Sequence, residues 1–272
     1  MDSTLVKGLS LLEWLARQQR ECGVSEVARA LGLARSNAHR TLQTLVSCGW
    51  AEQNPATSAY RPSLRLFEVG SLLGAAVDVA ARVRPFLADV AAATGETIHL
   101  ACLDGAEIVY LDKFDSPLPV AAYSRVGGRA PACCVASGKA LLAVERPDVA
   151  ALRRLFGGEL HAHTANSIVD FAALLSELER TAARGYAENR EEWRLGVCGL
   201  GVPVFDARGQ AVAAMGMSVP SIRFARVQAR SLAMKLMTCA RSASEALGYR
   251  PQNGKDRIPS GAARRLASQE TP

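Results

Sequence analysis

The stretch SEVARALGLARSNAHRTLQTLVSCGW, residues 25–50, holds two short helical patterns separated by a glycine. Ser25 stands where an N-cap would begin the first helix, and Gly32 suits the positive-φ position after a helix end. The second helix is expected over 35–48, where the apolar residues fall on one stripe and Gly49 follows. Two helices joined by a sharp glycine turn form a helix-turn-helix, whose second helix enters the major groove of DNA.

The face of the second helix that lies opposite its apolar stripe is polar. No acidic residue occurs over 35–48. Arg, Asn, Gln and Ser side chains reach base edges and phosphates in the major groove, whereas a merely solvated helix face usually mixes both charge signs. A solvated face on another kind of three-helix domain is the alternative. The candidate DNA-binding residues of this helix are Arg35, Ser36, Asn37, His39, Arg40 and Gln43.

The segments on either side extend this motif to a winged helix. Two short strands are expected over 50–53 and 60–62, joined by turn-forming residues over 54–58. Arg61 of this hairpin is placed to contact backbone phosphates. The helix that precedes the stretch has an apolar stripe of Leu5, Leu9, Leu12 and Ala16, with Leu11 and Leu15 alongside.

Length and composition argue against a membrane protein, a secreted protein and a metal-binding protein. The chain has 272 residues, enough for two domains, and no apolar run reaches the roughly 18 residues of a membrane span. The N-terminus lacks the features of a signal peptide, and the seven cysteines are scattered without a CxxC pair, so a cytoplasmic protein is expected. The pair His161 and His163 lacks further spaced ligands, so no metal site is predicted. Residues 249–272 are basic and low in apolar residues, which predicts a disordered tail.

The second half of the chain alternates strands and helices. A linker helix is expected over 64–79, and an α+β domain with a mainly antiparallel sheet over 80–248. Asp104-Gly105 lies between two strand patterns and predicts a hairpin. Strands are predicted over 97–103, 107–114, 119–124, 198–205 and 210–219, and helices over 135–145, 147–156, 168–184 and 224–247.

The order of the motifs resembles the IclR family of transcriptional regulators. The resemblance is carried by KGLSLLEWL (7–15), the stretch 24–50, YRPSLRLFEVGSLL (60–73), SRVGGRAPACCVASGKALLA (124–143) and YAENREEWRLGVCGLGVPVFDARGQAVAAMGMSV (186–219). It implies a winged helix-turn-helix domain over 1–63, joined through the linker helix to a GAF-like α/β effector-binding domain. It also implies a transcription regulator that binds a double-stranded DNA operator and a small organic-acid effector as a homodimer or homotetramer, without a cofactor.

The resemblance also assigns an effector site. Ala136 and Ser137 match backbone donors at a helix N-terminus, which suits a carboxylate. Asn189 stands where some members have Asp, and Gly216 and Ser218 match a pair that can both be Ser. Small side chains leave volume in this site, which favours a bulky or aromatic acid over a two- or three-carbon one. These small residues are Ala122, Ala130, Val197, Gly199 and Gly216.

Other interpretations of the second domain remain open. Adjacent Cys133 and Cys134 suggest a redox-responsive regulator, or, with His99 as a base, a cysteine-dependent hydrolase. No nucleophile elbow, P-loop or complete dinucleotide fingerprint occurs, so no catalytic residue is assigned and an enzyme is not expected. Arg129 either pairs with an anionic ligand or fixes its loop, and Lys139 faces solvent or an acid.

Overall fold

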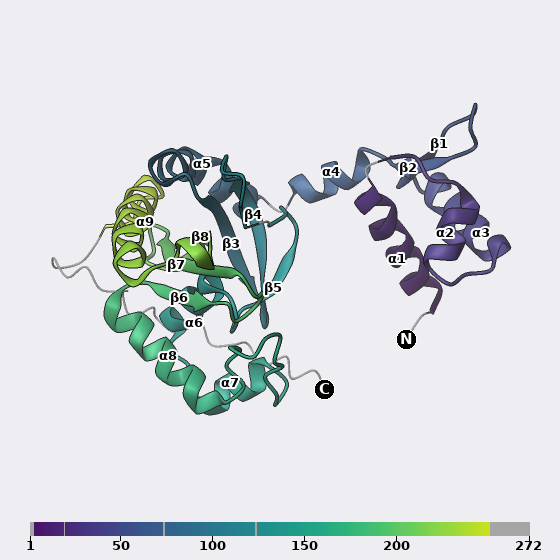
Figure 1. Ribbon diagram of the computed structural model, residues 1–272. Coiled ribbons are helices and arrows are strands. Elements are labelled where there is room, and N and C mark those ends of the chain that lie inside the picture. Colours follow the sequence, from purple (N-terminus) through teal and green to yellow (C-terminus); the bar gives the residue numbers. More distant parts are fainter. Residues whose placement is uncertain (1–2, 19, 73, 123, 251–272) are drawn as a thin grey trace. The chain divides into compact units, whose positions relative to one another are not determined.

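The computed structural model describes residues 3–18, 20–72, 74–122 and 124–250, and the chain divides into two compact units, 1–74 and 75–272 (Figure 1). The first unit contains α1 (Ser3–Gln18), α2 (Val24–Ala30), α3 (Arg35–Ser47), β1 (Ala51–Gln53), β2 (Tyr60–Pro62) and α4 (Arg65–Ser71). The second contains α5 (Ala75–Thr94), β3 (Thr97–Asp104), β4 (Glu107–Phe114), β5 (Arg129–Pro131), α6 (Ala136–Glu145), α7 (Val149–Leu155), α8 (Phe171–Arg184), β6 (Ala187–Arg190), β7 (Val197–Phe205), β8 (Ala211–Pro220) and α9 (Arg226–Ala246).

The first unit has the predicted winged helix-turn-helix arrangement. Strands β1 and β2 pair antiparallel, and the wing begins two residues after the helix-ending Gly49. Gly32, at φ 63°, makes the turn between α2 and α3. The prediction of Ser25 as the N-cap is wrong by two residues, because α2 begins at Val24 and Gly23 occupies the cap position without a side-chain hydrogen bond.

The buried side of α1 differs from the expected stripe. Leu11 and Leu15 are fully buried, whereas Leu5 and Leu9 are 60% and 53% exposed. Leucines lie on two adjoining stripes of this helix, so periodicity alone did not decide between them. The side that packs is the one facing α3 and the fully buried Tyr60.

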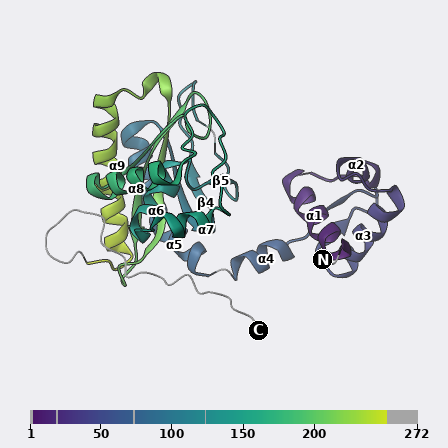
Figure 2. The same ribbon diagram turned by 90° about the horizontal axis from the view of Figure 1, so that it is seen from below.

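The second unit is a six-stranded, fully antiparallel sheet in the order β5-β4-β3-β8-β7-β6. Helices α5 and α9 pack on one face, where Met215 and Met217 are fully buried. Helices α6 and α8 cover the other face, and Figure 2 shows α6, α7 and α8 together over the sheet. The sheet therefore has a buried core on each side.

Local turn chemistry explains the two hairpins. Gly105, at φ 60°, connects β3 to β4, and Gly209, at φ 74°, lies between β7 and β8. The Asp206 carboxylate accepts hydrogen bonds from the backbone N–H groups of Arg208 and Gln210, at 2.9 Å each. Both hairpins are confirmed, and their strands end within one residue of the predicted limits.

The prediction of a strand over 119–124 is wrong. This segment contains no regular structure in its described residues, and β5 takes the edge of the sheet instead. Prolines at 117 and 119 remove two backbone donors from the approach to it. Side chains hold it in place: Thr97 Oγ1 donates to the Ala122 carbonyl at 3.0 Å, and Ser116 Oγ donates to the Gly95 carbonyl at 2.6 Å.

The segment expected as a linker, 64–79, is divided between two helices. Its first part forms α4, and α5 begins at Ala75 and continues through Pro85 to Thr94. Tyr249, expected in the tail, stacks on Phe205 with ring centroids 5.2 Å apart, and the rest of the tail lies outside the described residues. Over the described part of the chain, no helix combines the length and apolar character that crossing a membrane requires.

Candidate functional site

The polar face of α3 is exposed, and its residues belong to local networks. Arg40 Nη2 donates to Asn37 Oδ1 at 3.3 Å, while Ala38 and Leu42 bury the opposite face. Gln43 Nε2 donates to Gln53 Oε1 at 3.1 Å and to the Tyr60 hydroxyl at 2.8 Å. Arg35, Ser36, Asn37, His39, Arg40 and Gln43 are all exposed.

Two of the expected DNA-contacting residues, Gln43 and Arg61, bond to residues of the wing. Gln43 links α3 to the wing, so its amide helps to hold the hairpin against the helix. Arg61 on β2 pairs with Glu52 on β1, with Nη2 to Oε2 at 2.9 Å. Both side chains of this pair are about half exposed, and such a pair is weak enough to exchange for a phosphate.

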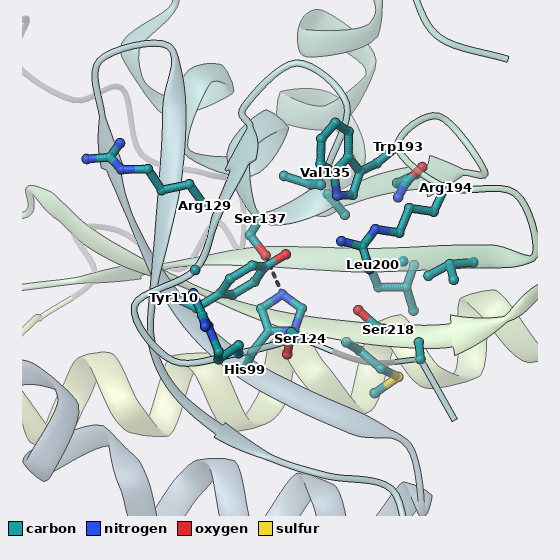
Figure 3. Close-up of a pocket in the computed structure, with 18 residues that line it drawn as sticks. His99, Tyr110, Ser124, Arg129, Val135, Ser137, Trp193, Arg194, Leu200 and Ser218 are labelled. Carbon is teal, nitrogen blue, oxygen red and sulfur yellow. Dashed lines mark hydrogen bonds between the residues drawn. The ribbon is translucent and has the colours of Figure 1, made fainter. Parts of the chain in front are cut away.

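A cavity of about 510 Å³ lies in the second unit, between the sheet and the N-terminus of α6 (Figure 3). The strand register places one row of residues across its floor. Asn189 pairs with Gly199, Gly199 with Ser218, and Ser218 with Thr97. Side chains two residues apart on a strand share a face, so the row through Gly201, Gly216 and His99 faces the same side.

Glycines let α6 lie against this floor. A Cβ on Gly201 would overlap the Ala136 carbonyl and would lie 2.7 Å from the Ser137 nitrogen. A Cβ on Gly138 would overlap the Ala132 carbonyl. These close backbone approaches bring the first turn of α6 to the sheet and require residues without a side chain.

The N-terminus of α6 presents backbone donors to the cavity. Val135 is its N-cap in an extended conformation, and no side chain caps the first turn. The first N–H groups of a helix have no partner within the helix and carry the positive end of its dipole. Ala136 and Ser137 both line the cavity, so an anion there would meet these groups.

His99 is the most buried ionisable group of the cavity. Its Nε2 lies 2.9 Å from Ser137 Oγ, and its ring meets Tyr110 edge-on with centroids 4.9 Å apart. Burial lowers the pKa of His99 to about 4 and raises the pKa of Tyr110, so both are neutral near pH 7. An irregularity in register between Leu100 and Ala101 pairs Ala101 with Tyr110 and so turns that ring toward His99.

The loop after β6 forms another wall of the cavity. Lys139, fully buried one turn into α6, pairs with Glu192 at 2.7 Å, so its side chain faces an acid rather than solvent. Burial raises the pKa of Glu192 despite this partner. Asn189 Oδ1 accepts from the Glu192 backbone N–H at 2.9 Å, which leaves its NH₂ to face other groups. Trp193 and Arg194 of the same loop line the cavity.

Seven of the nine expected effector residues line the cavity. Ala130 is instead buried on β5, and Gly216 lies beneath the side chains of His99 and Ser137. Arg129 also reaches the cavity wall, but it pairs with Asp104 and, at 3.0 Å, with Glu107, and it points away from the other labelled side chains in Figure 3. The residues present are Ala122, Ala136, Ser137, Asn189, Val197, Gly199 and Ser218.

Sequence reasoning missed several cavity residues. His99 had been considered only as a base for a cysteine, and Trp193 lies in a loop whose fold could not be derived from pattern. The alternation of β3 would have placed His99 on the same face as Thr97, which is the available signal. The further lining residues are Tyr110, Ser124, Arg125, Gly128, Val135, Trp193, Arg194, Leu200 and Met217.

The arrangement of the cysteines does not match a hydrolase. Cys133 and Cys134 are buried with their sulfurs 3.6 Å apart. Their mutual hydrogen bond lowers the pKa of Cys133 and raises that of Cys134. His99 bonds to Ser137 through Nε2, and its Nδ1 has no partner, so it is not positioned as the base for either thiol.

Comparisons with known proteins cover both units. The IclR helix-turn-helix domain matches residues 4–55, and the C-terminal domain of bacterial IclR transcriptional regulators matches residues 74–245. The HTH-type transcriptional regulator KdgR of Escherichia coli (strain K12) is 34% identical, covering 91% of this chain and 93% of that protein.

Solved structures share the fold. The crystal structure of Thermotoga maritima IclR has a TM-score of 0.73 at 30% identity, covering 92% of this chain and 100% of that one. An IclR homolog from Microbacterium hydrocarbonoxydans, complexed with 4-hydroxybenzoate, has a TM-score of 0.76 at 22% identity, covering 90% and 99%. With both of its domains matched, the chain belongs to the IclR family of transcriptional regulators, which are DNA-binding proteins rather than enzymes.

Proposed function

We propose that this regulator binds its operator through α3 and the wing, and that a small organic acid in the cavity of the second unit controls this binding. The observation that carries the proposal is the cavity of about 510 Å³ at the N-terminus of α6, in a chain whose α3 has an exposed face without acidic residues. The cavity provides a place for an effector, and α3 provides the surface for DNA.

A carboxylate is the group that the cavity suits best. The uncapped first turn of α6 supplies backbone donors and the positive end of a dipole. Arg125 and Arg194 line the cavity and, among the described residues, pair with no carboxylate. Asn189 is neutral and has its NH₂ available, so it adds a donor without the repulsion of a second carboxylate.

The size of the cavity favours a bulky or aromatic acid. Small-molecule sites typically measure about 300–1,000 Å³, and this cavity falls within that range. Ala122, Val197 and Gly199 contribute little bulk to its lining. The Microbacterium homolog with 4-hydroxybenzoate has the same fold, which supports an aromatic acid as a ligand class for this pocket.

Operator recognition is expected to involve at least two chains. Each chain supplies one recognition helix, and helix-turn-helix dimers read two half-sites of a pseudo-palindrome. Exposed apolar side chains on α1 and α4, including Leu9 at 53% and Phe67 at 74% exposure, support association through the first unit. A homodimer or homotetramer is therefore part of the proposal.

The test couples DNA selection to ligand binding. DNA fragments selected by the purified full-length protein would be sequenced, and their affinity measured with pyruvate, glyoxylate and substituted benzoates. We expect benzoates to bind in calorimetry and to change operator affinity. Tight binding of only the two smallest acids would contradict the size argument, and no effect of any acid on operator binding would contradict effector control.

A charge variant identifies the site. Asn189→Asp would place a carboxylate beside the bound acid, and we expect roughly tenfold or greater weakening of acid binding. Asn166→Asp is a matched control, because Asn166 is exposed and does not line the cavity. Equal effects of the two variants would show that the acid binds elsewhere.

A further inference from the structure

The amide of Gln43 joins α3 to the wing, and both of its donor hydrogens are used there. Gln43 Nε2 donates to Gln53 Oε1 at 3.1 Å and to the Tyr60 hydroxyl at 2.8 Å. A glutamine NH₂ group has two hydrogens, so these bonds use its full donor capacity. Gln43 is exposed, and within the described residues its Oε1 accepts no hydrogen bond. The group that this side chain can offer to DNA is therefore a carbonyl oxygen.

A backbone group in the wing sets the orientation of this amide. Gln53 Nε2 donates to the Ser58 carbonyl at 3.3 Å. A carbonyl oxygen can only accept, so the Gln53 amide must turn its nitrogen toward Ser58, and its oxygen is then the atom that faces Gln43. Gln43 must in turn present its own nitrogen to that oxygen. The order of nitrogen and oxygen in both amides thus follows from one carbonyl group of the wing.

The Ser58 carbonyl belongs to an anchored turn at the tip of the wing. Ser58 has φ 56°, and its N–H donates to the Asn54 carbonyl at 2.8 Å. The Asn54 side chain donates to the Glu21 carboxylate at 2.9 Å, and Thr57 Oγ1 donates to the same carboxylate at 3.3 Å. Glu21 lies in the segment between α1 and α2. The acceptor that orients the two amides is therefore tied to the body of the first unit.

Gln43 lies on the exposed face of α3 that carries Arg40. The two residues are three positions apart, so their side chains are neighbours on the helix surface. Ala38 and Leu42 are buried on the opposite side. When a helix of this kind enters the major groove, side chains on its outer face meet base edges.

The base edges differ in the hydrogens that they offer in the major groove. Cytosine presents its N4 amino group and adenine its N6 amino group, whereas guanine and thymine present only acceptors. A free glutamine amide bonds to adenine through both of its ends. Gln43 has no spare hydrogen, so its oxygen can accept from either amino group but has nothing to donate to guanine O6 or thymine O4.

We propose that the wing determines a base preference of α3 by fixing the Gln43 amide, with Gln53 as the positioning residue. The inference rests on the proposed function, which brings α3 and the wing to the operator. Gln43 then selects adenine or cytosine over guanine or thymine at one position of each half-site. Gln53 acts without touching that base, because it holds the amide that reads it.

Selection of DNA from a random library by the purified full-length protein, followed by sequencing, tests this proposal. We expect one position of each half-site to favour adenine or cytosine by roughly fivefold or more. Gln43→Ala should remove the preference at that position and leave the other positions unchanged. The comparison between the two proteins therefore identifies the position that Gln43 reads.

Three variants of Gln53 then change the partner that is offered to the amide. Gln53→Ala offers no acceptor, so Gln43 is free to turn and the preference should fall to about twofold or less. Gln53→Glu still offers an oxygen, so the preference should be retained. Gln53→Lys offers only hydrogens, so the amide should reverse, with the Tyr60 hydroxyl donating to it, and the position should favour guanine or thymine.

The readout separates orientation from charge and from general loosening of the wing. An added charge changes the affinity for all sequences alike, so it does not alter the ratio between bases at one position. A loosened wing would affect the Glu and Lys variants of Gln53 in the same way, whereas the proposal expects opposite results. Gln18→Ala is the matched control, because its amide donates to the Trp14 carbonyl within α1 at 3.2 Å, and it should leave the selected sequences unchanged.

The possible failures are distinct. If Gln53→Ala and Gln53→Lys select the same base as the unaltered protein, the wing does not set the amide and the inference is wrong while the proposed function stands. If all three Gln53 variants lose the preference alike, or if Gln43→Ala relaxes a position that favours guanine or thymine, the inference is again wrong. If Arg40→Ala and Gln43→Ala both leave the selected sequences and the affinity unchanged, α3 does not read the operator, and the proposed function fails with the inference.

Discussion

Replacing Gly216 tests the packing at the centre of the cavity. A Cβ at this position would overlap His99 Nε2 and Ser137 Oγ and would lie 2.7 Å from His99 Cδ2. The imidazole cannot withdraw cheaply, because it is buried against Tyr110. Overpacking costs about 1–3 kcal/mol and loss of the His99–Ser137 hydrogen bond adds about 1 kcal/mol, so Gly216→Ser should destabilise by roughly 2–4 kcal/mol.

Calorimetric unfolding measures this loss. For a chain of this size, the expected change lowers the melting temperature of the second unit by about 5–10 °C. Gly70→Ser is the control, since a Cβ there meets nothing within 4 Å, and it should be nearly neutral. Introducing Gly216→Ser into a His99→Ala background should cost less than it does in the unaltered chain, because the overlap with the ring is gone and only the overlap with Ser137 Oγ remains. A melting temperature unchanged by Gly216→Ser alone would refute the reasoning.

Four further predictions concern separate parts of the molecule. Arg40→Ala should weaken operator binding by about 1–3 kcal/mol without changing thermal stability, and unchanged affinity at physiological salt would exclude this helix from recognition. Lys139→Met should destabilise by about 3–5 kcal/mol because Glu192 keeps a buried, unpaired charge, and adding Glu192→Gln should restore part of that loss on thermal unfolding. Because burial lowers the pKa of His99 from 6.5 to about 4, the unfolded chain binds the proton first. The contribution of neutral His99 to the free energy of unfolding should be complete above about pH 6.5 and should decline by up to about 3 kcal/mol as the pH falls toward 4. His99→Gln should flatten this part of a curve of stability against pH. Operator affinity should be equal under reductant and mild peroxide, and a reversible loss that Cys133→Ser prevents would instead support the redox alternative.

The elements that could be predicted from the sequence are those specified by local chemistry. Gly32 follows the first helix of the helix-turn-helix and Gly49 follows the second, and both adopt positive φ. Asp104-Gly105 determines the hairpin of β3 and β4 within four adjacent residues. In β8, the alternation of side chains along the strand indicates which face is buried. In each case the residues that specify the structure lie within the element or a few residues from it in the sequence.

The failures arise where distant segments decide the outcome. Two leucine stripes on α1 are equally apolar, and only the tertiary packing of α3 and Tyr60 selects one. The segment 119–124 has strand-like composition, but its backbone is held by side chains from β3 rather than by a neighbouring strand. The pocket itself requires the register of four strands, which no local pattern encodes.

The fit between His99 and Gly216 concerns the interior of the cavity, which the resemblance does not describe. A serine at position 216 of this chain would exclude His99 from its present rotamer, because the Cβ alone would overlap Nε2. In this chain the missing side chain on β8 admits a ring from β3, and that ring binds the hydroxyl of Ser137 at the N-terminus of α6. Gly216 thus leaves room for an imidazole whose Nδ1 has no hydrogen-bond partner within the described residues. In the proposed effector site the backbone donors for a carboxylate belong to α6, so a change at position 216 would leave these donors in place.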